Sequence, residues 1–304
     1  MCRFLCYMGP EVHLADLLYR PNNSLILQSY RAQERTVPLN GDGFGIGWYA
    51  GDADSSTAPC VFTSITPAWS NQNLRRLSEH IKSPLFFAHV RAASPGLVVS
   101  EVNCHPFMIG RYLWMHNGTI RDFARIKRRL RESLPDDLYN SIEGTTDSEH
   151  AFAVFLNFVG GRERRLTARE MGYALVLTIA QLESWSDEAG VAGPSYFNFA
   201  VSDGESLAAV RYVSDPLLEP ASLYFSAGKK YRCVEGACLF EEAGSREASV
   251  IIASERLTEK TSDWTRVAPN HLLTVSANLE VNVELMEVVR HSSTDSTEER
   301  NLRE

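Results

Sequence analysis

The sequence predicts an α+β protein whose strands and helices form separate layers. Short apolar runs bounded by turn residues dominate the first 115 positions, segments with helical spacing follow between residues 120 and 182, and strand-like runs return after residue 196. This order differs from the regular alternation of a parallel βαβ array. We therefore expect a layered α+β domain.

Each element follows from its local pattern. Apolar runs predict strands at residues 3–8, 44–50, 61–65, 85–92 and 112–115. Apolar residues three and four positions apart predict helices at residues 71–81, 120–134, 148–159 and 168–182. Asp203-Gly204 predicts a hairpin turn between strands at 197–201 and 206–212. Further strands are expected at 224–227, 250–254, 272–276 and 281–289.

Composition and charge exclude several classes of function. The net charge is -8, whereas nucleic-acid binding needs clustered Lys and Arg, and the basic run at 125–131 is expected on a solvated helix face. No apolar stretch approaches the roughly 20 residues that cross a bilayer. The polar tail at 291–304 is expected to be disordered, which leaves a single domain over residues 2–290. We expect a cytoplasmic protein without nucleic-acid or membrane partners.

Six cysteines are scattered along the chain, without the density of a disulfide scaffold. We expect all six to be reduced. Cys104 with His105, and Cys233 with Cys238, lack the spacing of a complete zinc site, so no metal is expected.

Cys2 directly follows the initiator methionine, and a small residue there permits removal of Met1. Removal leaves the thiol beside a free α-amine. Their reference pKa values, about 8.5 and about 7.7–8.0, are close enough for the amine to act as the base of its own nucleophile. On this dipeptide alone, a cysteine packed in a first strand is the commoner situation.

Two further segments meet requirements of γ-glutamyl amide cleavage. Arg91 ends an apolar strand, and a guanidinium suits bidentate binding of an α-carboxylate. Asn117-Gly118 follows the strand at 112–115 and could offer a side-chain amide and a backbone N–H to an oxyanion. Their structural alternatives are an exposed strand-end arginine and an Asn-Gly hairpin turn.

An anionic partner for the α-ammonium group is predicted at Asp147. Thr146 and Glu149 predict a capping box there, which places Asp147 at a helix start. The alternative is an ordinary acid in a capped first turn.

Glycines alternate with other residues from Gly41 to Gly47. Their spacing matches neither a dinucleotide-binding motif nor a P-loop, so no nucleotide cofactor is expected. The alternation instead predicts a strand that a buried N-terminus or a ligand approaches closely.

Taken together, these motifs resemble the class II glutamine amidotransferases, which are N-terminal-nucleophile hydrolases. The motifs are Met1-Cys2-Arg3, Asn40-Gly41-Asp42-Gly43-Phe44-Gly45, His89-Val90-Arg91, Asn103-Cys104-His105-Pro106-Phe107, His116-Asn117-Gly118 and Thr146-Asp147-Ser148-Glu149. The later Ala253-Ser254-Glu255 is similar to a stand-alone branch of the family. That branch includes the amidotransferase-like subunit of the fungal cytosolic glutathione-degradation complex and the γ-glutamyl hydrolase of ergothioneine biosynthesis.

The resemblance implies a four-layer αββα sandwich and a γ-glutamyl amide hydrolase without a cofactor. It implies Cys2 as nucleophile and base, and Asn117 with Gly118 as the oxyanion hole. It also implies a substrate pocket formed by Arg91 on the α-carboxylate, Asp147 on the α-amine, and Ser94 and His105 at matching positions. A peptidase or synthetase subunit is the implied partner.

The chain departs from the glutamine-dependent synthases beside the pocket arginine. Ala92, Ser94 and Pro95 stand where those enzymes carry an aromatic residue, a threonine and a histidine, and Asn40 stands where arginine is common. A looser wall favours a leaving group larger than ammonia, as in glutathione. Three alternatives stay open: a glutaminase subunit that supplies ammonia to a partner synthetase, a non-catalytic regulatory subunit, and a Cys/His metal protein.

Overall fold

The computed structural model describes residues 2–34, 39–51, 58–93, 98–234, 237–244 and 247–289. Ser94, Pro95 and the tail predicted to be disordered, at 291–304, lie outside the described residues.

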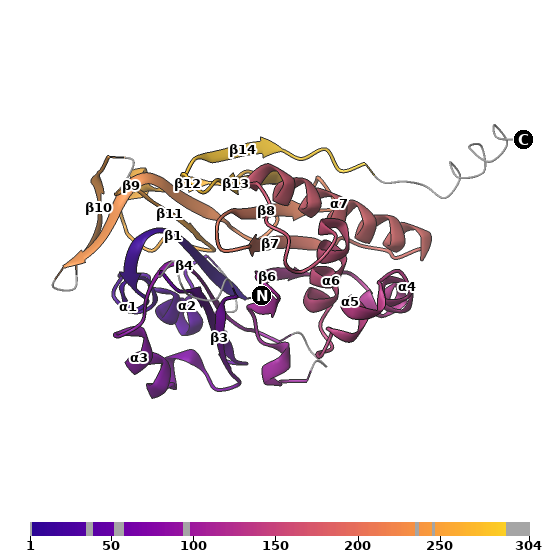
Figure 1. Cartoon of the computed structure of the whole chain (residues 1–304), viewed down its shortest axis with the longest axis horizontal. Coiled ribbons are helices and arrows are strands. Elements are labelled where there is room, and N and C mark those ends of the chain that lie inside the picture. Colours follow the sequence, from indigo (N-terminus) through magenta and orange to yellow (C-terminus); the bar gives the residue numbers. More distant parts are fainter. Residues whose placement is uncertain are drawn as a thin grey trace, which may run out of the picture.

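Two antiparallel sheets form the centre of the molecule (Figure 1). The first sheet has the order β10-β9-β11-β1-β4-β2-β3, and β12 also pairs with β9. Its strands are β1 (Arg3–His13), β2 (Phe44–Tyr49), β3 (Cys60–Ser64), β4 (Lys82–Val90), β9 (Tyr224–Val234), β10 (Ala237–Glu242), β11 (Ser249–Ala253) and β12 (Thr265–Arg266). The second sheet has the order β14-β13-β8-β7-β6-β5. Its strands are β5 (Phe107–Ile109), β6 (Tyr112–Thr119), β7 (Tyr196–Ser202), β8 (Leu207–Val213), β13 (His271–Val275) and β14 (Val281–Leu285).

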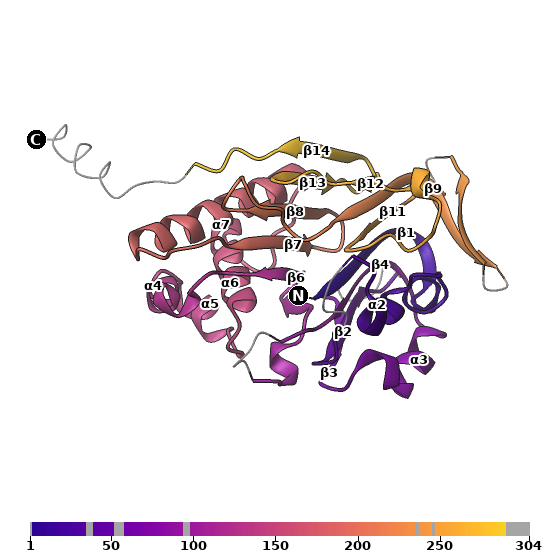
Figure 2. The same ribbon diagram turned by 180° about the vertical axis from the view of Figure 1, so that it is seen from behind.

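Helices cover the outer faces of both sheets, as the two opposite views show (Figures 1 and 2). The first sheet is covered by α1 (Ala15–Leu18), α2 (Leu25–Arg31) and α3 (Gln72–Ser78). The second sheet is covered by α6 (Asp147–Val159) and α7 (Ala168–Glu188), with α4 (Lys127–Glu132) and α5 (Asp136–Asn140) beside α6. The four layers form the predicted αββα sandwich.

Alternation along β1 decides which side chains face the space between the sheets. Leu5 and Tyr7 pack with the apolar cluster under α1 and α2. Phe4 and Cys6 pack in the cluster between the two sheets. Because successive side chains of a strand point to opposite faces, Cys2 belongs to the inter-sheet side.

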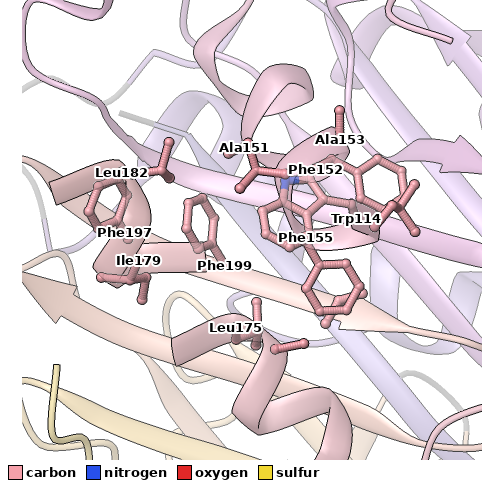
Figure 3. Close-up of a cluster of buried hydrophobic side chains, with 14 of the residues drawn as sticks. Trp114, Ala151, Phe152, Ala153, Phe155, Leu175, Ile179, Leu182, Phe197 and Phe199 are labelled. Carbon is pink, nitrogen blue, oxygen red and sulfur yellow. The ribbon is translucent and has the colours of Figure 1, made fainter. Parts of the chain in front are cut away.

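An aromatic core fastens α6 and α7 to the second sheet (Figure 3). Trp114 of β6 stacks on Phe152 with ring centroids 5.4 Å apart, and lies 4.6 Å from the ring of Phe199 on β7. Since Trp114 faces the helices, alternation along β6 directs Asn117 toward the first sheet. The burial of Trp114 on the helical face of β6 thus fixes the orientation of Asn117 on the opposite face.

The glycine-rich strand is approached closely, as predicted, but by the chain's own interior. A Cβ at Gly45 would collide with the carbonyl oxygen of His105, and one at Gly47 would lie 2.8 Å from Pro106 and Leu113. These residues, rather than a ligand or the N-terminus, occupy the room that the missing side chains leave.

Several predicted elements differ from the structure. The helix expected at 120–134 is interrupted, because Asp122 has a left-handed φ of 45° and a 3-10 turn precedes α4. Helices α1 and α2 were not predicted, since short helices show too little periodicity. Strand β10 was also missed.

The expectation that all six cysteines are reduced is wrong. Cys233 and Cys238 form a disulfide, whereas Cys2, Cys6, Cys60 and Cys104 are free. The bonded pair lies directly across the β9–β10 hairpin, with Cα atoms 4.1 Å apart. Without β10, the sequence offers no reason to bring these two residues together.

Within the described residues, every helix is too short or too polar to cross a membrane.

Counting thiols tests the disulfide. Protein purified without reductant and denatured in iodoacetamide should gain four carbamidomethyl groups, because two of the six cysteines are bonded to each other. Prior reduction should raise the number to six, as measured by intact mass. Six groups without reduction would contradict the pairing.

Truncating an aromatic side chain of this core should destabilise the protein. Phe155 of α6 is fully buried, so Phe155→Ala should lower the free energy of unfolding by about 3–5 kcal/mol in urea titrations. Tyr173→Ala is the matched control on α7, where the side chain is 64% exposed and the change should stay within about 0.5 kcal/mol. Equal losses in the two variants would be inconsistent with this core.

Candidate active site

The thiol of Cys2 lies against the end of β4. Pairing of Arg3 with Val90 sets the register of β1 on β4. Beyond that pair, the backbone N–H of Ala92 donates to Cys2 Sγ at 3.4 Å, and Sγ lies 3.6 Å from the Ala92 carbonyl oxygen. Cys2 is half-buried. The thiol is therefore held where β1 begins and β4 ends, and it is partly exposed.

Arg91 sits beside this thiol with its guanidinium buried. Its backbone N–H donates to the Gly43 carbonyl oxygen at 2.8 Å, and the guanidinium lies near the carbonyl oxygens of Asp42, at 3.4 Å, and Val98, at 3.5 Å. Within the described ranges, no acid forms an ion pair with Arg91. A buried guanidinium without a carboxylate partner is suited to an incoming anion.

His89 joins the two sheets at this end of the sandwich. Its Nε2–H donates to the carbonyl oxygen of His116 on β6 at 3.3 Å. Burial lowers the pKa of His89 to about 3, so its ring is neutral. Since Asn117 follows His116, this contact brings Asn117 close to β4, the strand that precedes Arg91.

The Asn117 amide is buried, and in the described structure neither its nitrogen nor its oxygen has a hydrogen-bond partner. Leaving a buried amide unsatisfied costs about 1–3 kcal/mol for each group, which a bound ligand would recover. Asn117 and Gly118 also continue β6 in register with β7, which rules out the hairpin-turn alternative. The amide therefore faces the inter-sheet space and is available to donate a hydrogen bond to a ligand.

Asp147 is the first residue of α6. Its carboxylate accepts from the backbone N–H of Ile120 at 2.8 Å and from the Ser148 hydroxyl at 3.1 Å. Ile120 directly follows β6, so Asp147 is tied to the strand that carries Asn117. Asp147 is half-buried and has no cationic partner in the parts of the chain described here, so its carboxylate is available to a cationic group of a ligand.

The capping box predicted from Thr146 and Glu149 is only half correct. Thr146 does accept from the Glu149 backbone N–H at 3.2 Å. The Glu149 carboxylate instead accepts from the backbone N–H groups of Glu143, at 2.8 Å, and Gly144, at 2.7 Å. It therefore shapes the turn before the helix rather than closing the box.

His116 braces the site from the helical side, a role that the sequence did not indicate. Its Nε2–H donates to the carbonyl oxygen of Tyr196 at 3.0 Å, and its Nδ1 lies 2.9 Å from the Ser148 hydroxyl. Burial lowers the pKa of His116, although the charge of Asp147 opposes the shift. The ring thus links β6, β7 and α6 around the candidate site.

Asn103 was also missed, although its motif had been recognised. Its amide donates to the Val98 carbonyl at 3.0 Å and its oxygen accepts from the Thr145 N–H at 2.9 Å. Val98 also contacts Arg91, and Thr145 lies two residues before Asp147. One buried side chain thus holds together the loops on both sides of the pocket.

His105 lies deeper than the other predicted residues. Its ring stacks on His89 at 4.3 Å and meets Phe107 edge-on at 4.6 Å. Burial lowers its pKa well below the usual range, and both ring nitrogens lack partners in the described structure. Its contact with substrate stays a prediction. Ser94 lies outside the described residues.

Across the described part of the chain, no three His, Cys, Asp or Glu side chains gather in an arrangement that could hold a metal ion.

Comparison with known proteins matches the chain to a family. The family model for class II glutamine amidotransferases matches residues 19–300. The chain is 41% identical over 292 residues to Probable glutamine amidotransferase DUG3 of Saccharomyces cerevisiae, covering 90% of this chain and 82% of that protein. It is 30% identical over 121 residues to Gamma-glutamyl-hercynylcysteine sulfoxide hydrolase of Mycobacterium tuberculosis, covering 40% of this chain and 50% of the relative.

Solved structures show the same fold. A glutamine aminotransferase class-II domain protein from Silicibacter pomeroyi superposes with a TM-score of 0.66 at 25% identity, over 95% of this chain and all of the other. The glutamine phosphoribosylpyrophosphate amidotransferase of Bacillus subtilis superposes with a TM-score of 0.58 at 14% identity, over 94% of this chain and 50% of that protein.

A methyl group at Gly118 should not fit. A Cβ there would collide with the Tyr196 carbonyl oxygen and lie 2.5 Å from the His116 ring, so Gly118→Ala should destabilise the protein by about 1–3 kcal/mol in urea titrations. Gly244→Ala is the control, because a Cβ there meets nothing within 4 Å. An unchanged Gly118→Ala protein would contradict the packing of β6 on β7.

Proposed function

The chain belongs to the class II glutamine amidotransferases, and on that premise we propose that it hydrolyses a γ-glutamyl amide with the Cys2 thiol as nucleophile after removal of Met1. Its relatives support an amidotransferase or γ-glutamyl hydrolase activity. The identity of the nucleophile and the leaving group are the proposed part.

One observation supports the proposal: among the described residues, the buried Asn117 amide has no hydrogen-bond partner and the buried Arg91 guanidinium has no carboxylate partner, and both belong to segments linked to the Cys2 thiol. Cys2 contacts the residue after Arg91, and β4 contacts β6 beside Asn117. Asp147 is tied to the end of β6. The carboxylate, the ammonium group and the carbonyl oxygen of a glutamyl group match the Arg91 guanidinium, the Asp147 carboxylate and the Asn117 amide, respectively.

In the proposed first step, the Cys2 α-amine takes the thiol proton, at a cost of about 1 kcal/mol given the reference pKa values. Sγ then bonds to the γ-carbonyl carbon, and the carbonyl electron pair moves onto oxygen. The Asn117 amide and the Gly118 N–H donate to that oxyanion. The C–N bond then breaks, the ammonium proton passes to the leaving nitrogen, and a γ-glutamyl thioester remains.

Water completes the proposed reaction. The freed α-amine takes a proton from the attacking water, whose oxygen bonds to the thioester carbon. The second tetrahedral intermediate uses the same oxyanion donors. When the C–S bond breaks, the thiolate recovers the proton and glutamate leaves. One water is consumed and one amine is released in each cycle.

The proposed pocket fixes the glutamyl half of the substrate through Arg91 and Asp147. Ala92 stands where the glutamine-dependent synthases carry an aromatic residue, and this smaller side chain supports a leaving group larger than ammonia. The mycobacterial relative is named for a γ-glutamyl amide with a sulfur-bearing leaving group. Glutathione or a related γ-glutamyl compound is therefore the proposed substrate class, and a peptidase subunit is a proposed partner.

Ammonia supply to a partner synthetase is the second candidate function. The name of the yeast relative, a probable glutamine amidotransferase, favours it. The two functions share the first step and differ in the donor and in what captures the released amine.

Glutamate release discriminates these functions. Protein whose loss of Met1 has been verified by intact mass should release glutamate from glutathione faster than from glutamine, with or without added partner subunits. Faster release from glutamine would favour ammonia supply. Inactivity on glutamine, glutathione and other γ-glutamyl amides would favour a regulatory subunit and contradict the proposed hydrolysis.

Removing the nucleophile should abolish turnover. Cys2→Ala, with Met1 removal verified by mass, should release no glutamate, because no other free thiol adjoins an α-amine. Cys60→Ala is the matched control, since Cys60 is an exposed free cysteine at the start of β3. Normal activity of Cys2→Ala would disprove the mechanism.

Removing the oxyanion donor should lower kcat and leave substrate affinity nearly unchanged. Asn117→Ala should reduce kcat about 10²–10³-fold, because the amide acts on charge that develops during the reaction. KM should change little, since the contacts to the α-carboxylate and α-amine remain. Steady-state glutamate release measures both constants, and a rise in KM with unchanged kcat would assign Asn117 to ground-state binding instead.

A further inference from the structure

We propose that Glu255 is a positioning residue that holds both the nucleophilic residue and the loop after α2 through one buried carboxylate. The inference rests on the proposed role of Cys2. Glu255 follows β11 and is 1% exposed. It lies outside the predicted substrate contacts.

The physical problem is the tethering of a terminal residue. Once Met1 is removed, Cys2 is attached to the protein on one side only, and chain ends fray unless they are tied down. An error of about 1 Å in a reacting atom can cost about 10²-fold in rate. The position of Cys2 must therefore be fixed through the residues that follow it.

Arg3 supplies the first tie. Its Nη1 donates to the Cys2 carbonyl oxygen at 3.0 Å. Its Nε donates to Glu255 Oε1 at 2.8 Å, and Nη2 lies 2.8 Å from the same oxygen. Both side chains are 1% exposed, so the ion pair is shielded from water. The carboxylate thus orients the guanidinium that holds the Cys2 backbone.

Ser254 supplies the second tie. The backbone N–H of Phe4 donates to the Ser254 hydroxyl at 3.0 Å, and the Ser254 N–H donates to the Phe4 carbonyl at 3.0 Å. Ser254 and Glu255 therefore clamp the two residues that follow Cys2, beyond the last strand pair of β1 and β11, Leu5 with Ala253.

The same carboxylate also holds the loop after α2. The backbone N–H of Gln33 donates to Oε2 at 2.9 Å, and that of Glu34 donates to Oε1 at 3.3 Å. Just before β2, the Asp42 carboxylate accepts from the Ala93 N–H at 2.8 Å. Ala93 lies one residue beyond the thiol's contact at Ala92, so Asp42 contacts the segment that borders the pocket.

Substituting glutamine should break this arrangement. It replaces one of the two carboxylate oxygens with an NH₂ group that cannot accept a hydrogen bond, and it leaves the buried charge of Arg3 without an anionic partner. Aspartate keeps the charge but is one methylene shorter. If Glu255 acts through Arg3, the double variant should lose less kcat, on a logarithmic scale, than the sum of the losses in the two single variants.

The test compares Glu255→Gln, Glu255→Asp, Arg3→Met and the double variant with wild type, each with Met1 removal verified by mass. The matched control is Asp263→Asn. Asp263 is a buried acid that pairs with Lys229 at 2.7 Å, and Lys229 pairs with Ser249 at the opposite end of β11 from Glu255. Glutamate release gives kcat and KM, and hydrogen exchange reports the order of residues 3–8 and 32–34.

Glu255→Gln should lower kcat about 10²-fold while KM changes less than about twofold, and both segments should exchange faster. Glu255→Asp should recover part of the rate, and Asp263→Asn should match wild type in rate and exchange of these segments. Should Glu255→Gln fail to fold, Glu255→Asp and Arg3→Met carry the same test.

Wild-type kcat in folded Glu255 variants, or full additivity in the double variant, would overturn the inference. An equal fall in rate for Asp263→Asn would do so too, since it would assign the effect to general stability. Inactive wild type would contradict the proposed function instead. Hydrogen exchange alone would then show whether Glu255 orders residues 3–8 and 32–34.

Discussion

The antiparallel pairing of β1 with β4 is the constraint on which the rest of the site depends. It places the first residues of the chain in the middle of a sheet, between β4 and β11, instead of at its edge. Central strands are paired on both sides and packed on both faces, so the N-terminus inherits the rigidity of the core. The contact of Cys2 Sγ with Ala92 is a continuation of this register.

Face-to-face packing of the two sheets then brings the second half of the site into place. The inter-sheet cluster surrounds Phe4 and Leu113 with apolar side chains, and Asn117 and Arg91 lie outside this cluster. There the Asn117 amide and the Arg91 guanidinium are buried, and among the described residues the amide has no hydrogen-bond partner and the guanidinium has no carboxylate partner. Burying such groups lowers the stability of the protein without ligand, and a ligand that forms hydrogen bonds with them recovers this free energy.

Buried polar contacts organise the loops around this end of the sandwich. Asn103 joins the loop after Arg91 to the turn before Asp147, and Glu255 joins the N-terminus to the loop after α2. Each contact bridges segments that are distant in sequence. Because both side chains are buried, their hydrogen bonds are protected from competition by water and can fix the geometry of the pocket.

The sequence by itself determined the layered α+β class, the main strands, and Cys2, Arg91, Asn117 and Asp147 as candidate site residues. Those features depend on local periodicity and on motifs such as His116-Asn117-Gly118, which a single chain displays directly. Only the tertiary structure decided that Asn117-Gly118 continues a strand, that Cys233 is bonded to Cys238, and how Glu255 contacts Arg3. These facts depend on strand register and on contacts between distant segments, which have no local signature.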